Sequence, residues 1–101
     1  MYYKGEQSMK PNSLKYRIDK DLIAYRIING ETVILNLDNG YYYNLDGAGT
    51  DIWQAIDQGL TLDEILELLK KEYGAPETIL KKDMLEFIKN LEQKKLIKKL
   101  I

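Results

Sequence analysis

The residues of this chain whose types are suited to chemistry or recognition lie mainly in one short stretch, Tyr41-Tyr42-Tyr43-Asn44. Three consecutive aromatic residues favour a strand, and alternation sends the middle ring to the opposite face from its two neighbours. At least one ring is then exposed or covers something outside the main packing. If this strand is a sheet edge, its unpaired backbone groups can accept an added peptide strand. The alternative is that tyrosine simply favours strands and that two rings belong to the core.

The chain lacks the residue types that most often carry out catalysis or bind transition metals. The chain has no cysteine and no histidine, which removes the commonest general base, thiolate nucleophiles and the commonest transition-metal ligands. The run Gly47-Ala48-Gly49-Thr50 lacks the spacing and lysine of a phosphate-binding loop, so a tight strand-to-helix corner explains it more simply. Ser8 and Ser13 have no histidine to activate them. We therefore predict that the protein is not an enzyme and binds no cofactor or metal.

Length and composition predict one globular domain. The chain has 101 residues, 45% of them hydrophobic and 31% charged, as in ordinary soluble proteins. Residues 1–13 are polar and contain Gly5 and Pro11, so we assign them to a mobile N-terminal arm and residues 14–101 to the domain. No apolar run approaches the roughly 18 residues of a membrane span, and the chain start lacks a signal-peptide core. We expect a cytoplasmic protein without membrane contact.

The net charge of −1 is unevenly distributed. Residues 1–20 carry five basic and two acidic groups, residues 21–60 carry one and six, and residues 61–101 carry nine and eight. Residues 81–99 contain seven lysines and three acidic residues, a local excess of four positive charges. This pattern favours a modestly acidic partner over a nucleic-acid duplex, which usually meets a stronger and more global basic excess.

The first half of the chain predicts a three-stranded antiparallel meander. Runs rich in β-branched and aromatic residues predict strands over 22–28, 32–38 and 41–45. Asn29-Gly30 and Asn39-Gly40 favour two-residue type I′ turns between them. One face then carries Ile23, Tyr25, Ile27, Ile34, Tyr43 and Leu45. The other carries Ala24, Val33, Leu35, Leu37 and Tyr42. Both faces are largely apolar, so the pattern predicts the strands more firmly than it predicts their register. One extra residue in a turn would move the side chains of the next strand to the other face.

The second half predicts helices. Asp46 is expected to cap a helix that runs to about residue 58, with Gly59 just beyond its end. Thr61 and Glu64 have the spacing of a capping box, which predicts a second helix from there to Gly74.

A third helix is expected after Pro76. Its core stripe follows at helical spacing: Leu80, Met84, Phe87, Ile88 and Leu91. Leu85 lies off this stripe, about 140° from Leu80, among polar residues and lysines. A lone apolar residue in such a place is usually a scattered surface leucine, and the alternative is the wall of a groove. The last apolar pairs, residues 96–97 and 100–101, are expected to form a helix end or a tail that packs back on the domain.

The order of these motifs resembles the PqqD family of precursor-peptide chaperones, also called RiPP recognition elements. The resemblance covers about residues 22–97 and rests on motifs that are loose singly and fairly specific in order and spacing. They are Val33-Ile34-Leu35-Asn36, Gly40, Tyr42-Tyr43, Leu45, Ile52-Trp53, Gly59, Thr61, Glu64-Ile65, Leu69, Tyr73, Asp83-Met84, Phe87-Ile88, Leu91 and Leu96-Ile97.

The resemblance implies an α+β fold, a three-stranded antiparallel β-meander followed by three α-helices in a winged helix-turn-helix-like arrangement, without enzymatic activity. It implies binding of the leader segment of a ribosomally synthesised precursor peptide by β-strand addition, between the third strand and third helix. The leader is then presented to a modifying enzyme, a radical SAM enzyme or a lasso-peptide peptidase and cyclase. We favour a stand-alone recognition element, with lasso-type pathways among the candidates. Carried over, the strand wall is Tyr41, Tyr42, Tyr43 and Asn44, and the helix wall is Lys81, Lys82, Leu85 and Lys89.

Two other functions fit the same elements. A winged-helix DNA-binding protein also has three helices and a hairpin, and a small structural subunit that docks on an enzyme needs no groove at all. Against the first, no arginine follows Arg26. Bidentate contacts from arginine to guanine are therefore unavailable in the last helix, and nucleic acid is not an expected partner.

Overall fold

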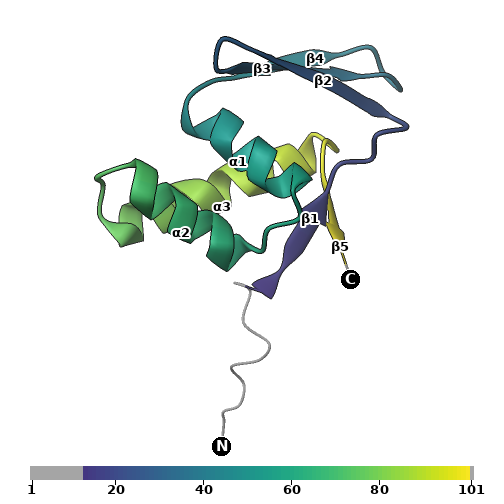
Figure 1. The fold of residues 1–101 in the computed structure, drawn as a ribbon. Helices are drawn as coiled ribbons and strands as arrows, with labels where there is room; N and C mark the ends of the chain where they lie inside the picture. Colours follow the sequence, from purple (N-terminus) through teal and green to yellow (C-terminus); the bar gives the residue numbers. More distant parts are fainter. Residues whose placement is uncertain (1–12, 101) are drawn as a thin grey trace, which may run out of the picture.

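The computed structural model describes residues 13–100, so the predicted N-terminal arm lies outside the described residues apart from Ser13. A three-stranded sheet lies over a layer of three helices, and a second, two-stranded sheet lies beside the helices (Figure 1). The predicted meander followed by three helices is confirmed. In chain order the elements are β1 (Lys15–Arg17), β2 (Ile23–Ile28), β3 (Glu31–Asn36), β4 (Tyr42–Leu45), α1 (Ala48–Asp57), α2 (Leu62–Glu72), α3 (Glu77–Gln93) and β5 (Lys98–Leu100).

The first turn of the meander is the predicted two-residue turn. Ile28 pairs with Glu31, and the two residues between them, Asn29 and Gly30, both have positive φ, 52° and 80°. This is the type I′ geometry whose twist matches that of the flanking strands, and asparagine and glycine tolerate it best.

The second turn is longer than predicted. The ladder pairs Leu35 with Tyr42, and the N–H of Asn36 donates to the carbonyl oxygen of Tyr41, so four residues, 37–40, lie in the loop instead of two. The side chain of Asn36 organises this loop, because its Oδ1 accepts the backbone N–H groups of Asp38 (2.9 Å) and Asn39 (3.3 Å). A two-residue turn at Asn39-Gly40 was therefore the wrong prediction. The register moves by two positions, an even number, so every side chain keeps its predicted face.

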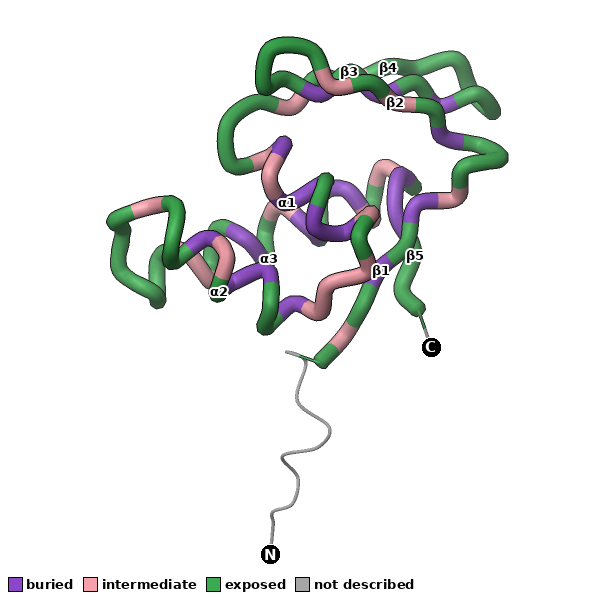
Figure 2. The backbone as a smooth tube through the Cα atoms, in the orientation of Figure 1, coloured by how far each residue is buried: buried purple, intermediate pink, exposed green. Residues whose placement is uncertain are grey.

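Burial follows those predicted faces. Ile23 and Ile34 are buried on the face toward the helices, and Tyr25, Ile27, Tyr43 and Leu45 are partly buried there. Exposed residues alternate with buried or partly buried residues along all three strands, so the opposite face is exposed (Figure 2). Its exposed residues are Ala24, Val33, Leu35, Leu37 and Tyr42.

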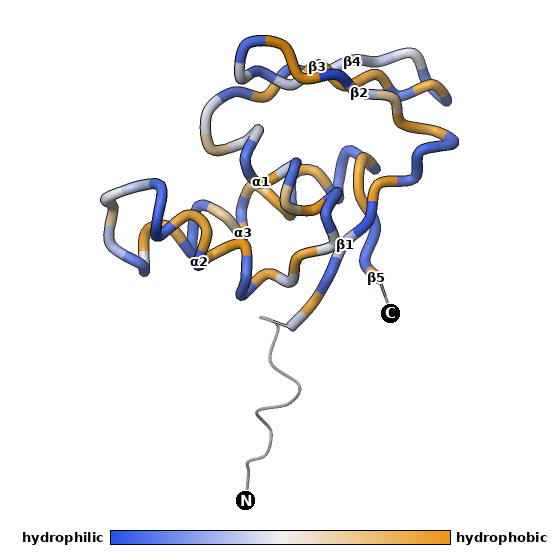
Figure 3. The backbone as a smooth tube through the Cα atoms, viewed as in Figure 1, coloured by the Kyte–Doolittle hydropathy of each residue, from blue (hydrophilic) through white to orange (hydrophobic). Residues whose placement is uncertain are grey.

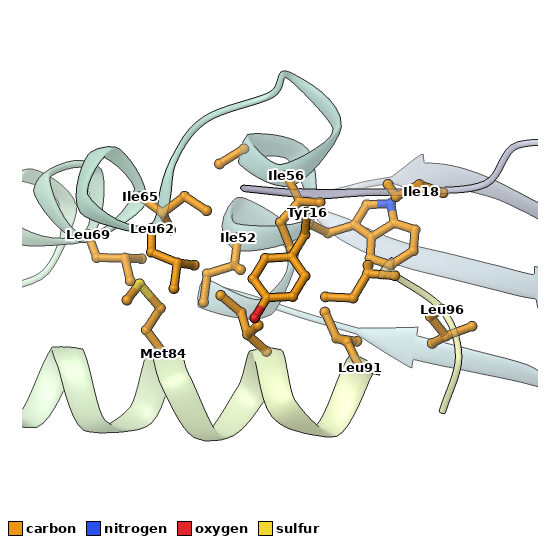
Figure 4. Close-up of a cluster of buried hydrophobic side chains, with 14 of the residues drawn as sticks. Tyr16, Ile18, Ile52, Ile56, Leu62, Ile65, Leu69, Met84, Leu91 and Leu96 are labelled. Carbon is orange, nitrogen blue, oxygen red and sulfur yellow. The ribbon is translucent and has the colours of Figure 1, made fainter. Parts of the chain in front are cut away.

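The core lies between the sheet and the helices and also takes in β1 and the residues before β5. Trp53 of α1 is fully buried, and Tyr25 of β2 meets it edge-to-face with ring centroids 5.4 Å apart. Figure 4 shows side chains from all three helices converging with Tyr16 of β1 and Leu96. Large apolar side chains from every layer are thus removed from water together, which supplies the main driving force for this fold.

The helix ends confirm two of the three predicted signals. Thr61 and Glu64 form the capping box, with each side chain accepting the other residue's backbone N–H (2.8 and 3.2 Å). Gly59 follows α1 with φ of 84°, as expected just beyond a helix end. Asp46 does not cap α1, because the corner turns one residue later and Gly47 is the N-cap, without a side-chain hydrogen bond.

A two-stranded ribbon, β1 paired with β5, was not predicted. Its register pairs Lys15 with Leu100, Tyr16 with Lys99, and Arg17 with Lys98. Leu96 and Ile97, which lead into β5, are buried as predicted for the first apolar pair of the tail, whereas Leu100 is 43% exposed and Ile101 lies outside the described residues. Among the helices of residues 13–100, none is long and apolar enough to cross a membrane.

Candidate functional site

The strand that carries the tyrosine run is an edge strand. In the order β2-β3-β4, one long side of β4 has no neighbour among the described residues. The N–H of Asn36 donates to the carbonyl oxygen of Tyr41 (2.8 Å), which sets the phase of the antiparallel ladder. Because hydrogen-bonded and non-bonded pairs alternate, Tyr43 turns its peptide groups to β3, whereas Tyr42 and Asn44 turn theirs to the open edge. The edge therefore offers two residues with free N–H and C=O groups.

The side chains of the predicted strand wall divide between two faces. Tyr41 and Tyr42 are exposed, at 66% and 71%, and Asn44 is exposed on the same outer face as Tyr42. Tyr43 is partly buried on the inner face, toward α3. The four residues thus surround the free edge of β4, with aromatic surface on both sides of it.

Two adjoining pockets lie between β4 and α3, and together we call them the β4–α3 groove. Both include Asn44 and Leu45. The first is also lined by Tyr43, Asn90, Leu91, Lys94 and Leu96. The second is also lined by Asp46, Gly47, Ala48, Gly49, Ile52 and Phe87.

Close contacts shape this groove. The ammonium group of Lys94 lies 5.8 Å from the centroid of the Tyr43 ring, and it donates to Oδ1 of Asn90 at 2.6 Å. At the other end, a Cβ on Gly49 would come within 3.2 Å of the Phe87 ring. The groove thus combines apolar surface, a positive charge at Lys94, a negative charge at Asp46 and a backbone edge, which suits an extended peptide.

The structure does not bring the predicted helix wall to this groove. None of its four residues, Lys81, Lys82, Leu85 and Lys89, lines either pocket. Leu85 is 39% exposed and lies about 160° around α3 from Phe87, at 100° per residue. These four residues therefore occupy another flank of the helix, and their contact with a peptide stays a prediction.

The sequence pattern does not identify three groove residues of α3 and its C-cap. It places Phe87 in the core stripe, although this residue is only partly buried, and it predicts no role for Asn90 or for Lys94, the C-cap residue. The signal was present, because Phe87, Asn90 and Lys94 follow at i, i+3 and i+7 and so share one helix face. Which face meets β4 depends on how α3 packs, and the sequence pattern leaves that open.

The perturbed ionisable groups lie elsewhere. Tyr25 donates to Asp57, which raises the pKa of Tyr25 to about 12. Burial opposes ionisation of Asp57, but hydrogen bonds from Lys20 and Tyr25 leave its pKa below the usual value. On α1, Asp51 accepts from Tyr73 (2.6 Å) and raises the pKa of that phenol to about 12. None of these residues lines the groove, and residues 13–100 contain no group of acidic side chains placed to hold a metal ion.

Sequence comparison assigns the chain to a known family. Residues 31–97 match the family described as coenzyme PQQ synthesis protein D (PqqD), and the chain therefore belongs to the PqqD family. The matched region runs from β3 to the residue before β5, so it contains β4, α3 and the groove between them.

Two solved structures are similar to this chain. The structure of TbiB1 in complex with the TbiA(beta) leader peptide has a TM-score of 0.77 and 29% identity, over 81% of this chain and 94% of TbiB1. Lasso peptide synthetase B1 complexed with the leader peptide has a TM-score of 0.76 and 19% identity, over 83% of this chain and 98% of its own. No curated protein sequence matches the chain.

Proposed function

We propose that this protein binds the leader segment of a ribosomally synthesised precursor peptide at the edge of β4 and presents it to a peptide-modifying enzyme. The observation that carries the proposal is the free edge of β4 beside a partly apolar groove. Membership of the PqqD family supports it, as does the similarity to TbiB1, whose structure contains a leader peptide.

In this proposal the leader forms a fourth strand of the sheet. Its backbone pairs with the outward N–H and C=O groups of Tyr42 and Asn44. Main-chain hydrogen bonds of this kind give affinity that depends little on the sequence of the leader. Alternate leader side chains then point into the β4–α3 groove, where Phe87 offers an apolar contact and Lys94 a positive charge. Every second side chain of the leader faces the groove, so the leader that fits best has an apolar residue toward Phe87 and an acidic residue toward Lys94 among these positions.

The protein itself is non-catalytic in this proposal. It holds the leader, and the chemistry belongs to a separate enzyme of the radical SAM class or to a lasso-type peptidase and cyclase. The likeness to lasso peptide synthetase B1, at 19% identity, concerns the fold, and the leader peptide bound to TbiB1, at 29% identity, supports a leader as the ligand. The working unit is the predicted domain, residues 14–101, in the cytoplasm.

The test measures fluorescence anisotropy of the labelled leader peptide encoded beside this gene, with wild-type protein and with Asn44→Pro. Proline removes the outward N–H of residue 44 without removing a hydrogen bond between β3 and β4, because that N–H faces the open edge. We expect leader binding to be lost while circular dichroism shows a folded protein. Asn44→Ala, which keeps the N–H, is the matched control and should bind with nearly wild-type affinity.

Two outcomes would contradict the proposal. Equal leader affinity of Asn44→Pro and Asn44→Ala would show that the β4 edge is not the binding surface. Binding of the wild-type protein to a random DNA duplex, without binding to the leader, would favour the winged-helix alternative.

A further inference from the structure

The ribbon of β1 and β5 presents an unusual concentration of positive charge. Directly opposed residues of an antiparallel pair share a face, so Arg17 and Lys98 lie side by side on the outer face, with Lys15 next to Arg17 along β1. All three are exposed, and both strands are largely hydrophilic (Figure 3). Like charges placed directly opposite each other destabilise a strand pair. This arrangement therefore opposes the stability of the ribbon.

Within residues 13–100, no ion pair neutralises these charges. The ion pairs found in residues 13–100 involve Lys20 and Lys70, and none involves a cation of the ribbon. Further lysines extend the positive surface, because Lys95 and Lys99 line a hollow with Lys98. One carboxylate, that of Glu92, lies in the same hollow. Together the ribbon and hollow hold five cations against one anion: Lys15, Arg17, Lys95, Lys98 and Lys99 against Glu92.

We propose that this basic ribbon is the docking surface for an acidic patch on the peptide-modifying enzyme, a proposal that rests on the proposed function. Charge complementarity identifies the partner's chemistry. Carboxylates of the partner that contact Arg17 and Lys98 would offset the repulsion between these two cations. The ribbon belongs to a different sheet from β4. A leader strand added to β4 therefore leaves the ribbon available.

Chain connectivity places the ribbon next to one end of the β4–α3 groove. Leu96 lines the β4–α3 groove, and β5 begins only two residues later, at Lys98. An enzyme held by the ribbon is thereby kept close to one end of the groove that holds the leader. Docking there shortens the search of the enzyme for its substrate, as in other tethered systems.

The rest of the molecule argues against a polyanion such as duplex DNA or an anionic membrane as the partner. The whole chain has a net charge of −1 and a pI near 5.5. Duplex binding usually goes with a domain-wide basic excess. Each strand of the ribbon has only three residues and spans roughly 10 Å, a size that fits a local acidic patch on a protein.

The test is a binding measurement with the modifying enzyme encoded beside this gene, immobilised and without leader. We expect the charge reversal Arg17→Glu/Lys98→Glu to weaken enzyme binding by about tenfold or more at low ionic strength, and wild-type binding to weaken as salt is raised. Arg26→Glu/Lys71→Glu changes the net charge equally on exposed residues outside the ribbon, the groove and the predicted helix wall, and should bind the enzyme nearly as wild type. Arg17→Gln/Lys98→Gln is a neutral second variant in case the reversed pair fails to fold.

The results separate this inference from the proposed function. Leader binding, measured by anisotropy on the same samples, should be unchanged in all three variants. Equal enzyme affinity of the ribbon and control variants would overturn the inference, as would ribbon-dependent binding to duplex DNA or phosphatidylglycerol vesicles without enzyme binding. If the wild-type protein does not bind the leader, the proposed function is overturned, while the enzyme measurement still tests the role of the ribbon.

Discussion

Lys94, the C-cap residue of α3, lies over the ring of Tyr43 of β4, with its ammonium group 5.8 Å from the ring centroid. This contact joins the two walls of the groove and places a positive charge where a leader strand would lie. A cation–π contact at a partly exposed site contributes about 0.5–1 kcal/mol, so its removal affects stability little.

The first prediction concerns this charge. Lys94→Met keeps the length of the side chain and removes the ammonium group, so we expect weaker binding of an acidic leader and a smaller dependence of affinity on salt. The control is Lys89→Met, on the exposed flank of α3 that does not line the groove. Leader anisotropy at two salt concentrations measures both. A larger loss for Lys89→Met would support the helix wall predicted from the sequence and contradict the groove.

The second prediction concerns Gly49, whose missing side chain leaves room for Phe87. A Cβ at this position would lie 3.2 Å from the ring of Phe87 and 3.4 Å from Cβ of Leu45, so Gly49→Ala crowds the groove. We expect leader affinity to fall by about tenfold, while the better helix propensity of alanine keeps stability within about 1 kcal/mol of wild type. Urea unfolding and leader anisotropy measure the two quantities.

The control for that prediction is Gly59→Ala. Nothing lies within 4 Å of a Cβ at Gly59, but its φ of 84° strains any other residue. This variant should lose about 1 kcal/mol of stability and keep its leader affinity. If Gly49→Ala binds the leader as tightly as Gly59→Ala does, Phe87 and its pocket are not part of the binding surface.

The third prediction concerns a buried hydroxyl pair that joins the sheet to α1. Thr32 donates to Thr50 (2.9 Å), and Thr50 donates to the carbonyl oxygen of Leu45 (3.2 Å). Thr50→Val should lower the free energy of unfolding by about 2 kcal/mol, because it leaves the Thr32 hydroxyl buried without an acceptor. Adding Thr32→Val should restore part of the loss. A double variant that is less stable than Thr50→Val, by urea denaturation, would contradict this account.

The fourth prediction concerns the end of α3. Lys95 has a φ of 62°, and the N–H groups of Lys95 and Leu96 donate back to Glu92 (2.9 Å) and Leu91 (3.0 Å). This is a Schellman motif in which lysine occupies the position that glycine favours. Lys95→Gly should raise the free energy of unfolding by about 0.5 kcal/mol, because relief of the strain exceeds the added entropy of the unfolded chain. A lower urea midpoint would contradict this.

A matched control places the same substitution inside the helix. Gln93→Gly, in the last turn of α3, should lower stability by up to about 1 kcal/mol, because glycine is a poor helix former. Opposite signs at positions 93 and 95 would show that backbone conformation, and not loss of a side chain, controls the effect.

The fifth prediction concerns alkaline pH. The hydrogen bond to Asp57 raises the pKa of Tyr25 in the folded protein from 10.0 to about 12. A raised pKa means that the folded state holds the proton more tightly, so the stabilisation is complete below pH 10 and is lost as the pH rises toward 12. Tyr25→Phe should therefore lose less stability than wild type over this range. Unfolding by urea at several pH values measures this, with Tyr41→Phe, an exposed site, as the control. An equal loss for Tyr25→Phe and wild type would contradict the assignment.

The acidic limb has the opposite sign. Asp57 has a lowered pKa in the folded protein, so its contribution is present above the ordinary value of 3.8 and disappears as the pH falls through the lowered one. Tyr25→Phe removes one of the hydrogen bonds that lower this pKa, and its stability should fall less steeply with acid than that of the wild type.

Local patterns in the sequence determined most of the elements. The turn at Asn29-Gly30, the capping box of Thr61 and Glu64, and the glycine after α1 depend on backbone preferences of a few consecutive residues, and all were predicted correctly. Both faces of the sheet were also predicted, because side-chain alternation survives a register change of two. The loop before β4 was predicted too short, since the hydrogen bonds of the Asn36 side chain compete with the signal of Asn39-Gly40.

Contacts between distant segments determined the rest. The pairing of β1 with β5 joins Arg17 to Lys98, across nearly the whole chain, and neither short lysine-rich strand has a pattern that predicts it. The sequence predicted that the strand with three tyrosines would be an edge, and the family resemblance implied that α3 would lie beside it. Only the packing of Met84, Ile88 and Leu91 into the core fixes the rotation of α3 and turns Phe87, Asn90 and Lys94, instead of Leu85 and Lys89, toward β4. The physical reason is that helical periodicity defines which residues share a face, whereas the neighbour of each face is decided by how the whole core closes.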